Sequence, residues 1–90
     1  MADISDRGSL RAEIIQDVEN VIDEELADSP FALTDDARQS IRDEIVNYTQ
    51  CILEALSFGE MRSQGAQALH LANMRAETQR LIRERRNWQG

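Results

Sequence analysis

The sequence contains no lysine, one cysteine, one proline and one histidine among its 90 residues. A single cysteine excludes a disulfide bond within the chain, and the absence of such bonds is typical of a reducing compartment. No apolar run approaches the roughly 20 residues that span a bilayer, and the N-terminus lacks the apolar segment of a signal peptide. We therefore expect a cytoplasmic protein that has no membrane partner.

Glycine is scarce as well, with four residues, while 41% of the residues are hydrophobic. This composition favours one packed helical domain over a disordered chain. A chain this short buries only about 60 to 65% of the surface that it exposes when unfolded, so association with another chain is expected to add stability. All ten basic residues are arginine, which indicates a GC-rich coding genome and, from it, a prokaryotic or phage source.

The segment 35–57 carries apolar residues at steps of three and four, which places them on one face of a helix. These residues are Ala37, Ile41, Ile45, Tyr48, Ile52, Ala55 and Leu56. Val46 and Leu53 define a second, narrower seam, so this helix needs two neighbours. Thr34 is a suitable N-cap, and Gly59 is placed to end the helix in a left-handed conformation.

A second amphipathic helix is predicted over 10–27, after a flexible lead-in at 1–8. Its apolar stripe comprises Leu10, Ile14, Ile15, Val18, Val21, Ile22 and Leu26. Pro30 follows the helix and ends it, which leaves Phe31 and Leu33 to close one end of the core. The short connection to the next helix predicts an antiparallel hairpin.

A third helix is predicted over 64–87, and it has two different faces. Small residues that would allow close packing against the hairpin form one strip: Gly65, Ala68, Ala72 and Ala76. Leu71, Met74, Leu81 and Trp88 recur with the spacing of a coiled-coil seam, which predicts self-association as a homodimer. The predicted fold is all-α: one domain over 1–90, a three-helix bundle-like arrangement whose longer third helix projects beyond the hairpin.

The residues with chemically active side chains do not form a recognisable catalytic or metal-binding pattern. His70 has no serine or cysteine three or four residues away, as a nucleophile activated on the same helix would require. Cys51 lies beside the apolar stripe of its helix and is expected to be a small buried hydrophobe. The acidic residues at 23–28 lack the spacing of a calcium loop or of a Glu-x-x-His di-iron site. We expect no catalytic residue, no cofactor, no metal and no enzymatic activity.

Charge is divided unequally along the chain. Residues 1–60 hold 15 acids and 4 arginines, a net charge of −11, whereas residues 61–90 hold 2 acids and 6 arginines, a net charge of +4. Four acidic residues share one flank of the first helix and form what we call the acidic ridge: Glu13, Asp17, Glu24 and Asp28. This ridge predicts a docking surface for a basic protein partner. The alternative is a solvated face that the chain's own arginines partly neutralise.

The end of the third helix carries four arginines and a tryptophan: Arg80, Arg83, Arg85, Arg86 and Trp88. Their spacing resembles the arginine-rich RNA-binding peptides of phage antitermination proteins, which implies arginines on phosphates and a tryptophan stacked on a base. The net charge of −7 opposes such binding. Our main prediction is therefore a protein-binding regulator, adaptor or inhibitor. An RNA- or DNA-associated protein and an oligomeric assembly subunit are the alternatives.

Overall fold

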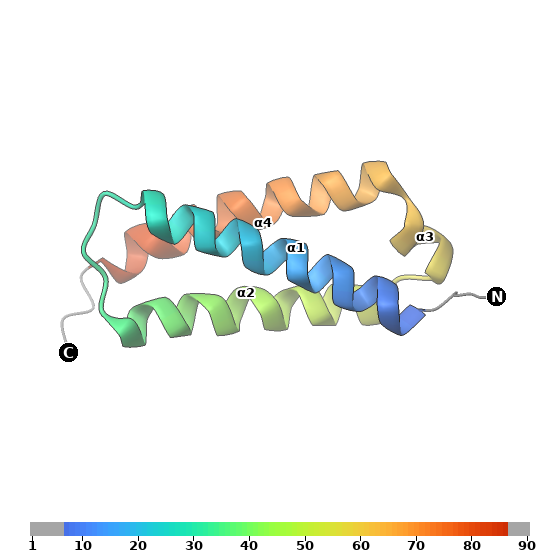
Figure 1. The fold of residues 1–90 in the computed structure, drawn as a ribbon, viewed down its shortest axis with the longest axis horizontal. Coiled ribbons are helices and arrows are strands. Elements are labelled where there is room, and N and C mark those ends of the chain that lie inside the picture. Colours follow the sequence, from blue (N-terminus) through green and yellow to red (C-terminus); the bar gives the residue numbers. More distant parts are fainter. Residues whose placement is uncertain (1–6, 87–90) are drawn as a thin grey trace.

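The computed structural model describes residues 7–86, and side chains from residue 8 onward, as four helices (Figure 1). The helices are α1 (Arg7–Asp28), α2 (Asp35–Ala55), α3 (Phe58–Arg62) and α4 (Gln64–Arg85). The described part of the chain contains no strand, so the all-α prediction is confirmed. The predicted lead-in at 1–8 lies outside the described residues up to residue 6, and Gly8 belongs to α1.

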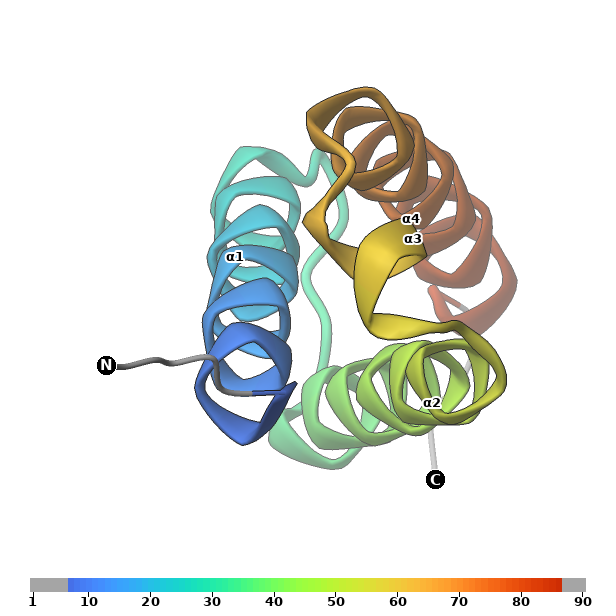
Figure 2. The same cartoon turned by 90° about the vertical axis from the view of Figure 1, so that its right-hand side faces the viewer.

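The three long helices lie side by side along the long axis of the domain. The antiparallel arrangement of α1 and α2 is as predicted, and α4 runs in the direction of α1 (Figure 1). Viewed along this axis, α1, α2 and α4 occupy the corners of a triangle, and α3 lies across one end (Figure 2). Because α4 packs against both α1 and α2, it does not project from the bundle as predicted.

The start of α2 follows the prediction, but its end does not. Thr34 is the N-cap, and its hydroxyl oxygen accepts a hydrogen bond from the Ala37 backbone N–H at 3.1 Å. The helix ends at Ala55, and Leu56 is extended. Gly59 does not terminate α2, because it lies inside α3, which begins directly after Ser57.

A capping box explains this early end of α2. The Ser57 hydroxyl accepts from the Glu60 backbone N–H at 3.2 Å, and the Glu60 carboxylate accepts from the Ser57 backbone N–H at 2.8 Å. The two residues thereby satisfy two backbone donors that a helix start leaves unpaired. A serine followed three residues later by glutamate indicates a helix start in the sequence, and the three predicted helices did not include it.

The apolar stripe of α1 is buried as predicted. Ile14, Val18, Val21, Ile22 and Leu26 are in the core, and Leu10 and Ile15 are half-buried beside it. Phe31 and Leu33, from the connection to α2, are half-buried and pack against the same core. The prediction that these two side chains close one end of the core is therefore confirmed.

The buried row of α2 differs from the predicted face. It consists of Ala37, Ile41, Ile45, Thr49 and Leu53, which are spaced by four residues. Tyr48 is 51% exposed, Ala55 is exposed, and Ile52 is half-buried. Rows of residues spaced by four are inclined to the helix axis, so a neighbour that crosses at an angle follows such a row. Leu53, predicted on the second seam, thus joins the core beside Ile14 and Met61.

The face of α4 that is buried is the opposite of the predicted one. Met74 and Leu81, predicted in a self-association seam, are buried within the domain, and Leu71 packs half-buried against the same core. Trp88 lies outside the described residues. The predicted strip of small residues is exposed instead: Gly65, Ala68, Ala72 and Ala76. Larger apolar side chains remove more surface from water, so burying the first set stabilises the fold more.

The difference in burial predicts that the same substitution lowers stability by different amounts at two positions of α2. Ile45 is 1% exposed, whereas Ile52 is half-buried beside a cavity. We expect Ile45→Ala to lower the free energy of unfolding by about 2 to 5 kcal/mol, because it removes buried surface and leaves a void. Ile52→Ala should cost clearly less in the same denaturant titration. A larger loss at Ile52 would contradict the assigned orientation of α2.

Candidate functional site

The acidic ridge lies on the surface of α1, where all four of its carboxylates are exposed. Glu24 accepts a hydrogen bond from the Arg75 guanidinium at 2.8 Å. Glu13, Asp17 and Asp28 form no ion pair with any side chain that the structure describes. The chain's own arginines therefore neutralise one position of the ridge and leave the charge of the other three.

Arg75 connects the basic and acidic parts of the chain. Its guanidinium on α4 donates to Glu24 and to Glu25, both on α1, and Gln79 donates to Glu25 at 2.9 Å. The hydrogen bond to Glu24, and next the one to Glu25, raise the pKa of Arg75 further above its ordinary value. Acidic and basic regions thus pair within the molecule at this position.

Three of the four tail arginines also have partners within the domain. Arg80 forms ion pairs with Glu77, at 2.6 Å, and with Glu84. Glu77, Arg80 and Glu84 follow one another at spacings of three and four residues on α4, so both ion pairs lie within one helix. The hydrogen bonding of the Arg80 guanidinium to the Glu77 carboxylate is the main reason why the pKa of Arg80 is raised.

The other tail arginines reach residues that precede α4 in the chain. Arg85 forms an ion pair with Glu44 on α2 at 2.7 Å, and the Arg86 guanidinium lies 5.1 Å from the centre of the Phe31 ring. Arg83 is exposed. Binding of phosphates by Arg80 or Arg85 would therefore compete with ion pairs inside the domain.

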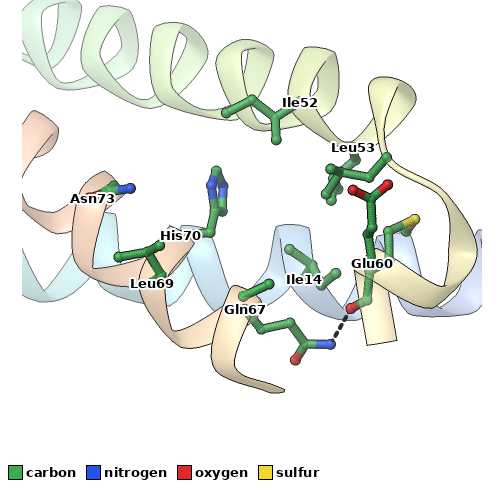
Figure 3. A pocket seen from close by; sticks show the side chains of 11 residues that line it. Ile14, Ile52, Leu53, Glu60, Gln67, Leu69, His70 and Asn73 are labelled. Carbon is green, nitrogen blue, oxygen red and sulfur yellow. Dashed lines mark hydrogen bonds between the residues drawn. The ribbon is translucent and has the colours of Figure 1, made fainter. Parts of the chain in front are cut away.

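A groove that could not be read from the sequence runs between α2 and α4; its lining is mainly apolar at the α3 end and more polar toward Tyr48 and Glu77. Two neighbouring cavities, of about 260 and 350 Å³, form it. They share Ile52 of α2 and both His70 and Asn73 of α4, so they lie next to each other along the two helices, and Figure 3 shows the lining of the first. Leu69 lines the first cavity and Tyr48 the second. These are the most exposed large hydrophobic residues of the described chain, at 63% and 51%. We call this feature the α2–α4 groove.

His70 lies in the wall of the groove and points from α4 toward α2 (Figure 3). Its Nε2 lies 3.1 Å from the Thr49 hydroxyl oxygen, a hydrogen bond that joins the two helices. Partial burial lowers the pKa of His70, because the charged imidazolium loses hydration there. Nothing in the sequence indicated Thr49 as the partner of His70, although Thr49 continues the four-residue spacing of Ile41 and Ile45.

The short helix α3 closes one end of the groove. Met61 is buried there, and its backbone carbonyl accepts a hydrogen bond from the Gln67 side chain at 2.5 Å (Figure 3). Glu60 lines the same cavity. Its hydrogen bonds from the Ser57 backbone, and next from the Ser57 side chain, lower the pKa of the Glu60 carboxyl, so this end of the groove carries a negative charge at neutral pH.

Cys51 is exposed, so the prediction of a small buried hydrophobe is wrong. It lies on α2 two positions from Thr49, on the side of the helix opposite the inclined buried row. Within residues 7–86, no three histidine, cysteine, aspartate or glutamate side chains come together as metal ligands would. None of the described helices has the length and apolar character needed to cross a membrane.

No protein-family model, curated protein or solved structure matches the chain. Its function is therefore inferred below from the chemistry of its own surfaces.

The lowered pKa of His70 predicts a pH-dependent loss of stability. Below about 6.5, the ordinary value, the unfolded chain binds a proton at His70 more readily than the folded chain does, so acidification favours unfolding. His70→Gln keeps a side chain that can bond Thr49 but cannot titrate. We expect the melting temperature of the wild type to fall more than that of His70→Gln between about pH 7.5 and pH 5.5. An equal fall in melting temperature for the two proteins would contradict the burial of His70.

Proposed function

We propose that the protein is a non-enzymatic regulator, adaptor or inhibitor that binds a basic surface of another protein through the acidic ridge of α1. The observation that carries this proposal is the incomplete neutralisation of the ridge. Glu13, Asp17 and Asp28 are exposed and form no ion pair with the described side chains, in a chain whose net charge is −7. An unpaired row of like charges raises the rate of encounter with an oppositely charged surface.

Two further internal ion pairs support the proposal, because their arginines bind acidic residues outside the ridge. Arg42 pairs with Asp23, and Arg11 pairs with Glu54 at 3.4 Å. Such exposed pairs contribute about 0 to 1 kcal/mol each, so they orient side chains more than they stabilise the fold. None of these pairs involves Glu13, Asp17 or Asp28, so the charge of these three carboxylates remains on the exposed flank of α1.

The RNA-binding alternative has less support. Arg80 and Arg85 would have to leave their glutamate partners before they could bind phosphates. The net charge of −7 would repel the same phosphates. For the assembly-subunit alternative, the burial of Met74 and Leu81 removes two of the four residues on which the predicted self-association depended.

Charge reversal on the ridge tests the proposal. Glu13→Arg together with Asp17→Arg should slow association with the partner by about tenfold or more, because attraction becomes repulsion. Glu24 is left unchanged so that its bond to Arg75 is kept. The matched control, Asp36→Arg with Asp43→Arg, makes the same change of net charge at exposed positions of α2. Partner capture from a nuclease-treated lysate of the source cells, followed by binding kinetics, measures the difference, and thermal melts establish that both variants fold.

Two results would overturn the proposal. In the first, the ridge and control variants capture the partner equally well. In the second, capture disappears with nuclease treatment and the bound RNA depends on Arg80 and Arg83. RNA affinity would then fall with salt by about 0.7 logarithmic units per phosphate contact for each tenfold rise in salt.

A further inference from the structure

The α2–α4 groove is separate from the acidic ridge, which lies on α1. We propose that this groove binds one amphipathic helix of a partner protein, with an apolar stripe toward the groove and lysine or arginine on its flanks. The proposal rests on the proposed protein-binding function, and it adds a second surface together with the secondary structure and charge of the partner segment. Binding of an amphipathic helix in a hydrophobic groove is a recurring mode of peptide recognition.

The length of the groove fits a short helical segment. Its lining extends from Tyr48 of α2 to Leu56, the residue directly after that helix, and on α4 from Ala66 to Glu77. At a rise of 1.5 Å per residue, these stretches are about 12 and 16 Å long, or two to three turns of a helix. A partner helix of that length presents three anchors, at positions i, i+3 or i+4, and i+7.

The side chains along the groove suit contact with another helix. Leu69 and Tyr48 are large, apolar and more than half exposed, so covering them would remove apolar surface from water. Ile52 is half-buried between them and would be covered further. Ala66 and Ala76 line the two cavities and are exposed, and their small side chains allow a second helix to approach closely.

The charges around the groove select the flanks of the partner helix. Among the described residues that line the two cavities, the charged ones are Glu60 and Glu77. His70 is held toward its neutral form by burial. Glu77 shares Arg80 with Glu84, so negative charge is in excess at that end as well. Lysine or arginine on the flanks of a bound helix would complement both ends of the groove.

The same charges disfavour a second copy of this chain as the occupant. A symmetric dimer places identical surfaces together, so Glu60 and Glu77 of one chain would face the same carboxylates of the other. No arginine lines the described groove, and Arg80, which pairs with Glu77, is shared with Glu84. Both chains would also carry a net charge of −7. A basic partner segment would be attracted to Glu60 and Glu77 rather than repelled by them.

A designed peptide probes the groove directly. The probe has about 18 residues, with leucine on one helical face and lysine elsewhere, a length that permits a helix once bound. One control peptide replaces lysine by glutamate, and another scatters the same leucines around the helix. We expect only the first peptide to bind at about 0.15 M salt. In the NMR spectrum of the full chain, binding of this peptide should shift the backbone amide signals of Ile52, Leu69 and Asn73.

Substitutions in the groove provide the decisive comparison. Tyr48→Gln combined with Leu69→Gln should weaken binding of the leucine–lysine peptide by about tenfold or more, because two apolar anchors are lost. Both residues are more than half exposed, so the fold should be kept. Ala72→Gln is the control, at an exposed position of α4 outside the groove. It should bind the peptide as the wild type does.

Equal peptide affinity in the groove variant and the wild type would overturn the proposal. Equal binding of the scattered-leucine peptide, or no binding of any peptide, would do the same. A wild-type dimer that Leu69→Gln dissociates would assign the groove to a second copy. Each of these results leaves the ridge test above unaffected. Failure of the proposed function is recognised separately, when the charge reversal at Glu13 and Asp17 leaves partner capture unchanged.

Discussion

Burial of the apolar stripe of α1 is the constraint on which the rest of the structure depends. Val18 and Ile22 of this stripe are fully buried, in one cluster with Ile45 of α2 and Leu81 of α4. Because both other long helices cover the same stripe, α2 and α4 each pack more extensively against α1 than against each other. The α2–α4 groove follows from this arrangement, since their shared edge is the least closed side of the triangle.

The same arrangement determines where charge remains on the surface. Arg75 lies on the edge that α4 shares with α1, and it neutralises Glu24 in the middle of the acidic ridge. Farther along α1, Glu13 and Asp17 meet no described arginine. The domain thus presents a negatively charged surface on α1 and an apolar one between α2 and α4, and our proposals assign both to contacts with a basic protein.

The sequence predicted those parts of the fold that depend on one helix alone. The stripe of α1 and the Thr34 cap needed only local periodicity and a local hydrogen bond. It did not predict that Thr49 would be buried in place of Tyr48, because the angle between two packed helices decides which row faces inward. The groove could not be predicted for the same reason, since its lining comes from all four helices together.

The rotation of α4 about its own axis buries Met74 and Leu81 and leaves Leu69 at the groove. Paramagnetic relaxation of methyl signals by a soluble probe measures this rotation directly. We predict strong relaxation of the Leu69 methyl groups, which are on a residue 63% exposed, and protection of Met74 and Leu81, at 2% and 1%. Protection of Leu69 equal to that of Leu81 in a dilute sample would contradict the packing described for α4.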